Sequence, residues 1–179
     1  MVIIFGPAGS GKSLQGQFLA ARNGWRWLSV GQVLRDTKDR KIHRTQRKGT
    51  LVDNRVVIPI MKRAIDKSLH DVDNIVLDGY PRDFSQAEWL LNHNYPIDLA
   101  ISLIVPKKEL FKRLHIRGRA DDTSPDVITE RISIFEREFS PIRQLLLDHK
   151  VKVIDIDGDG TVGEVHDRIA KEVAKCKLA

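Results

Sequence analysis

Residues 2 to 13 constrain the fold more than any other stretch of this chain. They read Val-Ile-Ile-Phe-Gly-Pro-Ala-Gly-Ser-Gly-Lys-Ser, an apolar run followed by the spacing GxxxxGK(S/T). The run is typical of a buried strand. Glycines let the next residues fold closely around a phosphate, so that backbone N–H groups and the start of a helix face the anion. Lys12 is then expected to reach the terminal phosphates and Ser13 to bind Mg²⁺.

Short apolar runs alternate with helical patterns along the rest of the chain. Leu14, Phe18 and Leu19 recur at three- and four-residue spacing, so we expect the helix after the glycine loop to pack this face on a sheet. Pro59 should kink its helix or lie near the first turn, and Pro141 should interrupt a long helix. Further strands are predicted at residues 25–29, 75–77, 99–105 and 151–156, and the last helix at 162–174.

Five strands that alternate with helices predict an α/β fold, with a five-stranded parallel sheet flanked by helices on both faces. No internal repeat, low-complexity tract or linker interrupts this pattern. We therefore expect one domain over residues 1–179.

Composition limits the classes of protein to consider. The chain has 30 basic and 24 acidic residues, a net charge of +6, which suits polyphosphate ligands and RNA equally. Its single cysteine, Cys176, excludes an internal disulfide and a thiolate zinc cluster, so we expect a reducing compartment and no zinc. No stretch of 18 apolar residues occurs, and the N-terminus enters the first strand at once, so a cytoplasmic protein that does not bind a membrane is predicted.

Asp78 and a group of arginines are the candidate site residues outside the glycine loop. Asp78 ends an apolar strand, at the edge where parallel sheets bind ligands, and could hold Mg²⁺ through water. Its alternative role is to cap the next turn. Arg113, Arg117 and Arg131 border the apolar stripes of two helices, where a guanidinium needs an anion as partner, and Arg119 lies between them. That anion could be a phosphate undergoing transfer or a nearby carboxylate.

Several motifs, in this order, resemble those of adenylate kinases. The most specific is Asp78-Gly-Tyr-Pro-Arg82 followed by Gln86. The others are Gly6 to Gln15, Leu28 to Arg35, Gly49-Thr-Leu-Val, and Arg117-Gly-Arg119-Ala-Asp-Asp122, so the resemblance covers nearly the whole chain. It implies a P-loop kinase that transfers a phosphoryl group from Mg-ATP to AMP, with a small helical acceptor-binding insertion at about 30–58 and a vestigial lid at about 117–124.

The resemblance also implies a role for each matched residue. Lys12, Arg82, Arg113, Arg119 and Arg131 would act in catalysis, and Ser13 and Asp78 would hold the metal. ATP would bind Gly9, Ser10, Gly11, Lys12, Ser13, Leu14, Arg113, Arg117 and Gly158. The acceptor would bind Ser29, Arg35, Val57, Gly79, Arg82, Gln86, Arg119 and Arg131, with Gln86 reading the adenine edge. A monomer is expected.

Departures from the family pattern leave the acceptor open. Val30-Gly31-Gln32 replaces the usual Thr-Gly-Asp, and the customary lid between Gly118 and Arg119 is missing. A kinase for CMP, UMP or another small acceptor, and a nucleotide-dependent switch protein with slow ATPase activity, are therefore the alternatives.

Two further patterns are given less weight. The basic segment 35–48 has seven basic and two acidic residues but no interleaved aromatics, so nucleic acid is not the expected partner. Residues 155–160 nearly match a calcium loop, but His166 replaces its final Glu.

Overall fold

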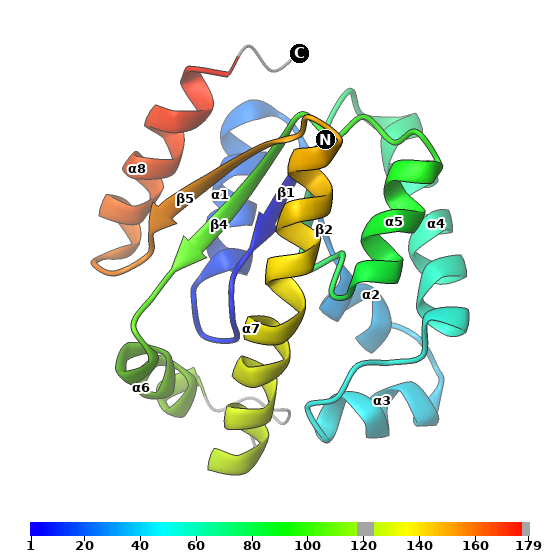
Figure 1. Ribbon diagram of the computed structural model, residues 1–179, viewed down its shortest axis with the longest axis vertical. Helices are drawn as coiled ribbons and strands as arrows, with labels where there is room; N and C mark the ends of the chain where they lie inside the picture. Colours follow the sequence, from blue (N-terminus) through cyan, green and yellow to red (C-terminus); the bar gives the residue numbers. More distant parts are fainter. Residues whose placement is uncertain (118–123, 177–179) are drawn as a thin grey trace.

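The protein folds into a parallel sheet between two layers of helices (Figure 1). The computed structural model describes residues 1–117 and 124–176. Its five strands lie in the order β2-β3-β1-β4-β5, and each pair is parallel. The predicted α/β sheet is confirmed, with the strands β1 Val2–Phe5, β2 Arg26–Ser29, β3 Ile75–Asp78, β4 Leu99–Ile104 and β5 Lys152–Asp157.

Helices cover both faces of this sheet because successive residues of β1 point to opposite sides. Val2 and Ile4 pack with α1 and α8, whereas Ile3 and Phe5 pack with α4, α5 and α7. All four strand residues are at most 3% exposed. The helices are α1 Lys12–Asn23, α2 Val30–Arg35, α3 Arg40–Arg47, α4 Asn54–Asp71, α5 Phe84–Asn92, α6 Lys107–Arg117, α7 Pro125–Asp148 and α8 Val162–Ala174.

The packing face predicted for α1 is confirmed at Leu19 and wrong at Leu14 and Phe18. Leu14 and Phe18 are 39% and 43% exposed, and the buried face consists of Gln15, Gly16, Leu19 and Ala20. Gly16 explains the difference, since a Cβ there would lie 3.1 Å from the ring of Trp27 and 3.4 Å from Val76. A residue without a side chain lets α1 approach the sheet closely, which turns Leu14 toward the functional site.

Both predicted prolines lie inside continuous helices, Pro141 in α7 and Pro59 in α4. Helix α7 is continuous from Pro125 to Asp148, so the predicted interruption at Pro141 is wrong. Proline lacks the N–H of one helical hydrogen bond, but Ile142 and Leu146 are buried directly after it and keep the helix on the sheet. Pro59 lies inside α4, beyond the first turn.

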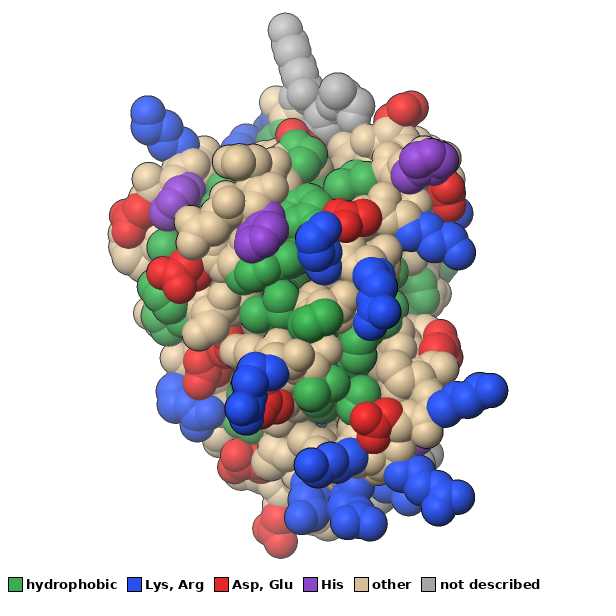
Figure 2. Space-filling model, turned by 90° about the vertical axis from the view of Figure 1, so that its right-hand side faces the viewer, with side chains coloured by type: hydrophobic (Ala, Val, Ile, Leu, Met, Phe, Trp, Pro, Cys, Tyr) green, Lys and Arg blue, Asp and Glu red, His purple; other side chains and the backbone are tan. Residues whose placement is uncertain are grey.

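The basic segment 35–48 begins at the last residue of α2 and forms one further short helix, α3. Asp39 caps α3, its carboxylate accepting hydrogen bonds from the N–H groups of Lys41 and Ile42. Gly49 then ends the segment with a positive φ of 74° and an N–H bonded to Gln46 O. In Figure 2, Lys and Arg side chains gather at the lower end of the molecule, where Figure 1 places α3.

The order of the strands decides where a ligand can bind. β1 lies at the centre and pairs with β3 on one side and β4 on the other; the connection after β1 leads to β2 on one side, whereas the connection after β4 leads to β5 on the other. Ile4 of β1 is in register with Asp78 of β3, which places Asp78 beside the start of the glycine loop. Within the described part of the chain, no helix is long and apolar enough to span a bilayer.

Candidate active site

The glycine loop connects β1 to α1 as its sequence predicts. Gly9 and Gly11 have positive φ values of 85° and 88°, a conformation that favours glycine. A Cβ on Gly9 would lie 2.9 Å from Leu110 O. Lys12 folds back over the loop, and its Nζ donates to Pro7 O at 3.2 Å. The local sequence therefore places the ammonium above a concave turn of backbone.

Two cavities open on either side of this loop. The first, which we call the loop cavity, lies between the glycine loop, α6 and the start of α8. The far wall of this cavity is formed by the segment 157–161, here called the β5–α8 loop. The residues that line the loop cavity are Gly9, Ser10, Gly11, Lys12, Ser13, Leu14, Gln15, Arg113, Arg117, Gly158, Gly160, Thr161, Val162 and Val165.

The second, which we call the arginine cavity, lies between α1, α2, β3 and the segment 46–50. It is lined by Lys12, Ser13, Gln17, Trp27, Ser29, Gly31, Gln32, Arg35, Gln46, Gly49, Thr50, Asp78, Gly79, Arg82, Arg117 and Arg131. Five of these residues are cationic, and among the described lining residues Asp78 is the only carboxylate. The cavity is therefore suited to a phosphate group.

The arginines converge although they come from different elements. A Cβ on Gly31 would lie 3.3 Å from Arg35 Nη1 and 3.6 Å from Arg82 Nη2, so the two guanidinium groups meet above this glycine. Arg82 is oriented by a hydrogen bond from its Nε to Gly79 O at 2.8 Å. Arg35 donates from Nη2 to Gln32 Oε1 at 2.9 Å. Their side chains are thus held in place before an anion arrives.

The electrostatics of the site lower the pKa of Lys12. Its pKa falls from 10.5 to about 8, chiefly because burial disfavours the charged ammonium. The positive charges of Arg82, Arg131 and Arg117 lower it further, while the carboxylate of Asp78 acts in the opposite direction. A bound anion would relieve this repulsion, so the site as it stands is arranged for a negatively charged ligand.

Asp78 fits a role in holding Mg²⁺. The residue is 1% exposed, and neither carboxylate oxygen has a hydrogen-bond partner among the described residues. A buried carboxylate without a partner is costly unless a cation or water satisfies it. Asp78 and Ser13 line the same cavity and supply oxygen ligands, which magnesium prefers.

Some predicted residues lie away from the arginine cavity. Arg113 faces the loop cavity, with Nε bonded to Glu109 Oε1 at 2.9 Å and Nη1 to Gly158 O at 3.0 Å. Val57 is buried in the core and is not among the described residues that line the loop cavity or the arginine cavity. Arg119 lies outside the described residues.

Gln86 is also buried, and protein groups engage its amide. Its Oε1 accepts a hydrogen bond from the backbone N–H of Arg82 at 2.8 Å, and its Nε2 donates to Asn54 Oδ1 at 2.7 Å and to Asp83 Oδ2 at 3.0 Å. The side chain therefore stands directly behind Arg82 and connects α4 to the start of α5.

Sequence reasoning missed several residues that line the arginine cavity. Trp27 was not among the predicted site residues, yet it lines the cavity together with Ser13 and Gln17. Gln46 and Thr50 flank Gly49, so the Gly49-Thr-Leu-Val motif was the available signal for this wall. No spacing in the sequence pointed to Gln17.

Comparison with known proteins agrees with this geometry. The family model described as adenylate kinase matches residues 4–150. The chain belongs to the adenylate kinase family. It is 32% identical to the adenylate kinase of Prochlorococcus marinus subsp. pastoris over 97% of both chains. Adenylate kinases of Porphyromonas gingivalis and Mycobacterium leprae are 32% and 33% identical, each over 97% of this chain and over 95% and 99% of their own.

Family membership makes this protein a phosphotransferase, a nucleoside monophosphate kinase of the adenylate kinase type. Members of the family use ATP and Mg²⁺, and their substrates are nucleotides. The fold and the two cavities described above are consistent with that chemistry.

Proposed function

We propose that this kinase transfers the γ-phosphoryl group of Mg-ATP, bound in the loop cavity, to AMP, whose phosphate binds in the arginine cavity. One observation carries the proposal. Lys12, Ser13 and Arg117 line both cavities, so the two cavities meet at the residues that would surround a transferred phosphoryl group. In-line transfer requires donor and acceptor on opposite sides of such a point.

The residues around this junction would act mainly by charge and position. Lys12, Arg117 and Arg131 would stabilise the charge on the transferred group, and Arg35 and Arg82 would hold the acceptor phosphate. No general base is assigned, because a phosphate oxygen is already a nucleophile. Asp78, through water, and Ser13 would hold Mg²⁺, which supplies positive charge to the donor phosphates when bound.

Arg113 and Gly158 would contact the donor from the far wall of the loop cavity. Gly9, Ser10, Gly11 and Leu14 would enclose the donor phosphates from the near wall. Arg119 remains a proposed catalytic residue on the strength of its match to the family motif. Ser29 and Gly79 line the arginine cavity and would contact the acceptor, and Val57 would support that wall from the core.

The assignment of AMP depends on Gln86, whose amide can both donate to and accept from adenine. To do so it would exchange Asn54 and Asp83 for the base. Because this amide is already engaged, a kinase for CMP, UMP or another small acceptor is the second candidate. The two candidates differ only in what Gln86 reads.

We also propose a division of the chain into working parts. Residues 30–58 would form the acceptor-binding insertion, since Arg35, Gln46 and Thr50 line the arginine cavity from this segment. The exposed charges of α3 would raise the local concentration of an anionic acceptor, or they would only be solvated by water and have no effect on the acceptor. The lid predicted at about 117–124 remains a proposal, since residues 118–123 lie outside the described part of the chain. A monomeric, cytoplasmic protein remains a prediction.

A panel of AMP, CMP, UMP and GMP, incubated with Mg-ATP, tests the proposal by chromatography of the diphosphate products. Acceptor-dependent ADP formation, greatest with AMP, is expected. A preference for CMP or UMP would support the second candidate. Slow release of inorganic phosphate, independent of the acceptor, would instead support a nucleotide-dependent switch.

A further inference from the structure

The β5–α8 loop is held by arginines at three successive carbonyl groups. Arg168 of α8 donates from Nη1 to Asp157 O at 2.9 Å and to Asp159 O at 2.5 Å. The carbonyl between them, Gly158 O, accepts from Arg113 at 3.0 Å. Such bonds to a charged donor are stronger than bonds between neutral groups. The loop is thus fixed from α6 on one side and from α8 on the other.

This loop has little room for another conformation. The N–H of Gly158 donates to Ile104 O at 2.8 Å, and a Cβ there would lie 2.7 Å from Val105. Gly160 has a φ of 119°, and its Cβ position would lie 2.9 Å from Glu164 Oε2 and 3.6 Å from Arg168 Nη2. Arg168 therefore packs directly beneath the turn that forms the wall of the loop cavity.

The start of α8 is also connected to the phosphate-binding side of the cavity. Gln15, two residues after Ser13, donates from Nε2 to Val162 O at 2.9 Å and is only 3% exposed. Gln15 and Val162 both line the loop cavity. The distance between the glycine loop and the β5–α8 loop is consequently set by protein contacts before a nucleotide binds.

We propose that Arg168 is a positioning residue for the donor nucleotide, holding the β5–α8 loop where it forms the far wall of the cavity for ATP. The inference rests on the proposed binding of ATP in the loop cavity. A loop already ordered spares the nucleotide the entropic cost of ordering it, so donor affinity should depend on Arg168 although the side chain does not line the cavity. Sequence reasoning assigned no role to this residue.

Arg168→Ala removes both hydrogen bonds to the loop and should raise the KM for ATP about tenfold. The KM for AMP and kcat should stay within about twofold, because no residue of the loop is among the described residues that line the arginine cavity. Arg168→Lys should recover part of the loss, since one ammonium can donate to a carbonyl but lacks the fork of a guanidinium.

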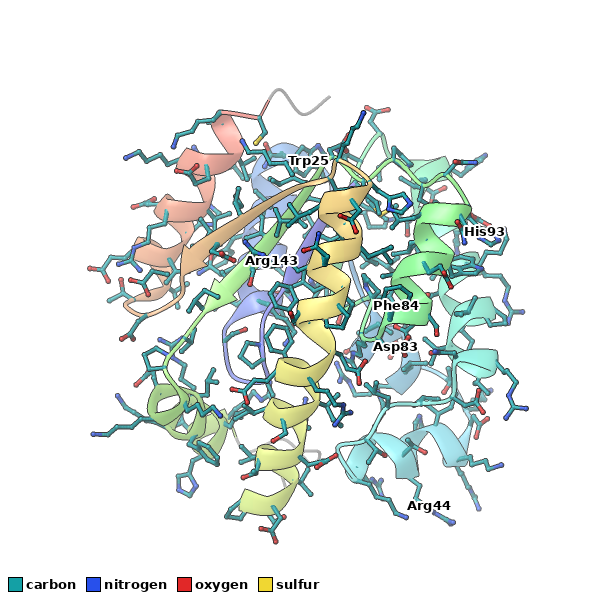
Figure 3. The ribbon with its side chains drawn as sticks, viewed as in Figure 1. Trp25, Arg44, Asp83, Phe84, His93 and Arg143 are labelled. Atoms are coloured by element: carbon teal, nitrogen blue, oxygen red, sulfur yellow. The ribbon has the colours of Figure 1, made fainter. Side chains whose placement is uncertain are left out.

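Arg143→Ala is the matched control. Arg143 donates to Asp155 Oδ1 of β5 at 2.6 Å, and its side chain is 33% exposed compared with 40% for Arg168. Figure 3 shows it on α7, beside the sheet. This variant removes a similar arginine contact to the same strand but should leave the KM for ATP unchanged. Thermal melts of both variants would show whether either loses stability.

Two results would overturn the inference: an unchanged KM for ATP in Arg168→Ala, or equal rises in the KM for ATP and for AMP. Failure of the proposed function is a separate result, in which the unaltered protein forms no ADP from AMP. In that case calorimetric titration with a non-hydrolysable ATP analogue still decides the matter. A weaker affinity in Arg168→Ala than in Arg143→Ala would support the positioning role, and equal affinities would contradict it.

Discussion

The loop cavity and the arginine cavity are built from different parts of the chain. Glycines from the glycine loop and from the β5–α8 loop line the loop cavity, and hydrogen bonds such as that from Gln15 to Val162 O fix its walls. Long cationic side chains dominate the arginine cavity and reach it from α1, α2, α6, α7 and the loop after β3. The near wall of the loop cavity is a property of local conformation, whereas its far wall and the whole of the arginine cavity exist only when distant elements are packed correctly.

This difference predicts how each cavity fails. Substitutions in the loop cavity should affect the donor, and substitutions in the arginine cavity should affect the acceptor. Residues shared by both should affect the transfer itself. The following changes test that division.

Lys12→Met should have the largest effect because Lys12 lines both cavities. We expect kcat to fall by about a thousandfold or more, since a cation next to the transferred group is lost. Steady-state assays measure the loss, and circular dichroism should show an unchanged fold. Lys62→Met, which removes an exposed lysine paired with Asp66, should leave kcat unaltered. Unchanged turnover in Lys12→Met would refute the role of the loop.

Arg82→Ala should affect the acceptor alone. Arg82 meets Arg35 above Gly31 and does not line the loop cavity among the described residues. The kcat/KM for AMP should fall about a hundredfold, while the KM for ATP stays near its original value. Arg55→Ala, on an exposed residue paired with Asp53, serves as control. A matching rise in the KM for ATP would show that the two cavities are not separate.

Asp78→Asn should weaken the use of Mg²⁺. The buried carboxylate has no hydrogen-bond partner among the described residues, and an amide cannot replace its charge. At limiting Mg²⁺ we expect turnover to fall about tenfold to a hundredfold, with partial recovery as the metal is raised. A magnesium titration of both proteins measures the shift, and chelation by EDTA should abolish turnover in each. An identical titration curve would remove Asp78 from the metal site.

The pH dependence of donor binding should follow Lys12. Its pKa of about 8 in the free protein means that the cation is lost as pH rises through that value. A bound phosphate raises the pKa of Lys12, so ATP binding above about pH 8 requires Lys12 to take up a proton. ATP affinity should therefore fall about tenfold per pH unit above about pH 8, up to the pKa of Lys12 in the complex. Calorimetric titrations of ATP measure this fall, and Lys12→Met should not show it.

The same shift in the pKa of Lys12 has a consequence for stability. The unfolded chain, with a pKa of 10.5 for this lysine, binds more protons than the folded one between about pH 8 and 10.5. The contribution of Lys12 to the free energy of unfolding should rise over that range. Denaturant unfolding of the unaltered protein and Lys12→Met would isolate it, and parallel curves would contradict the lowered pKa.

Gln86→Ala should have the smallest effect and decides between the two acceptor candidates. If Gln86 reads adenine, kcat/KM should fall several-fold to about tenfold more for AMP than for CMP or UMP. An equal loss of kcat/KM for all acceptors would mean that Gln86 only supports Arg82, from whose backbone N–H it accepts a hydrogen bond. The acceptor panel measures both outcomes.

The glycine loop could be predicted from the sequence because its conformation is local. The glycine spacing predicted the turn, and the apolar run of β3 predicted the place of Asp78 at the edge of the sheet, where it lines the arginine cavity. The face of α1 could not be read from periodicity, because the close approach at Gly16 depends on Trp27 of another strand. The continuity of α7 through Pro141 likewise depends on burial of the residues that follow it.

The arginine cavity was predicted less completely. Arg117 and Arg131 were recognised from their place beside apolar stripes, but Arg113 occupies the same kind of position and turns to Glu109 and Gly158 O instead. Periodicity gives the face of a helix and not the partner of a long side chain. Arg168 had no sequence signal at all, since its role depends on a loop folding back over its own helix.

The most direct test of the account follows the γ-phosphoryl group itself. The protein is incubated with AMP, Mg²⁺ and ATP labelled in the γ-phosphate, and the products are separated. We predict that the label appears in the β-phosphate of ADP formed from AMP, with little inorganic phosphate. Label found only in inorganic phosphate, at a rate independent of AMP, would contradict the meeting of two cavities at one transferred group.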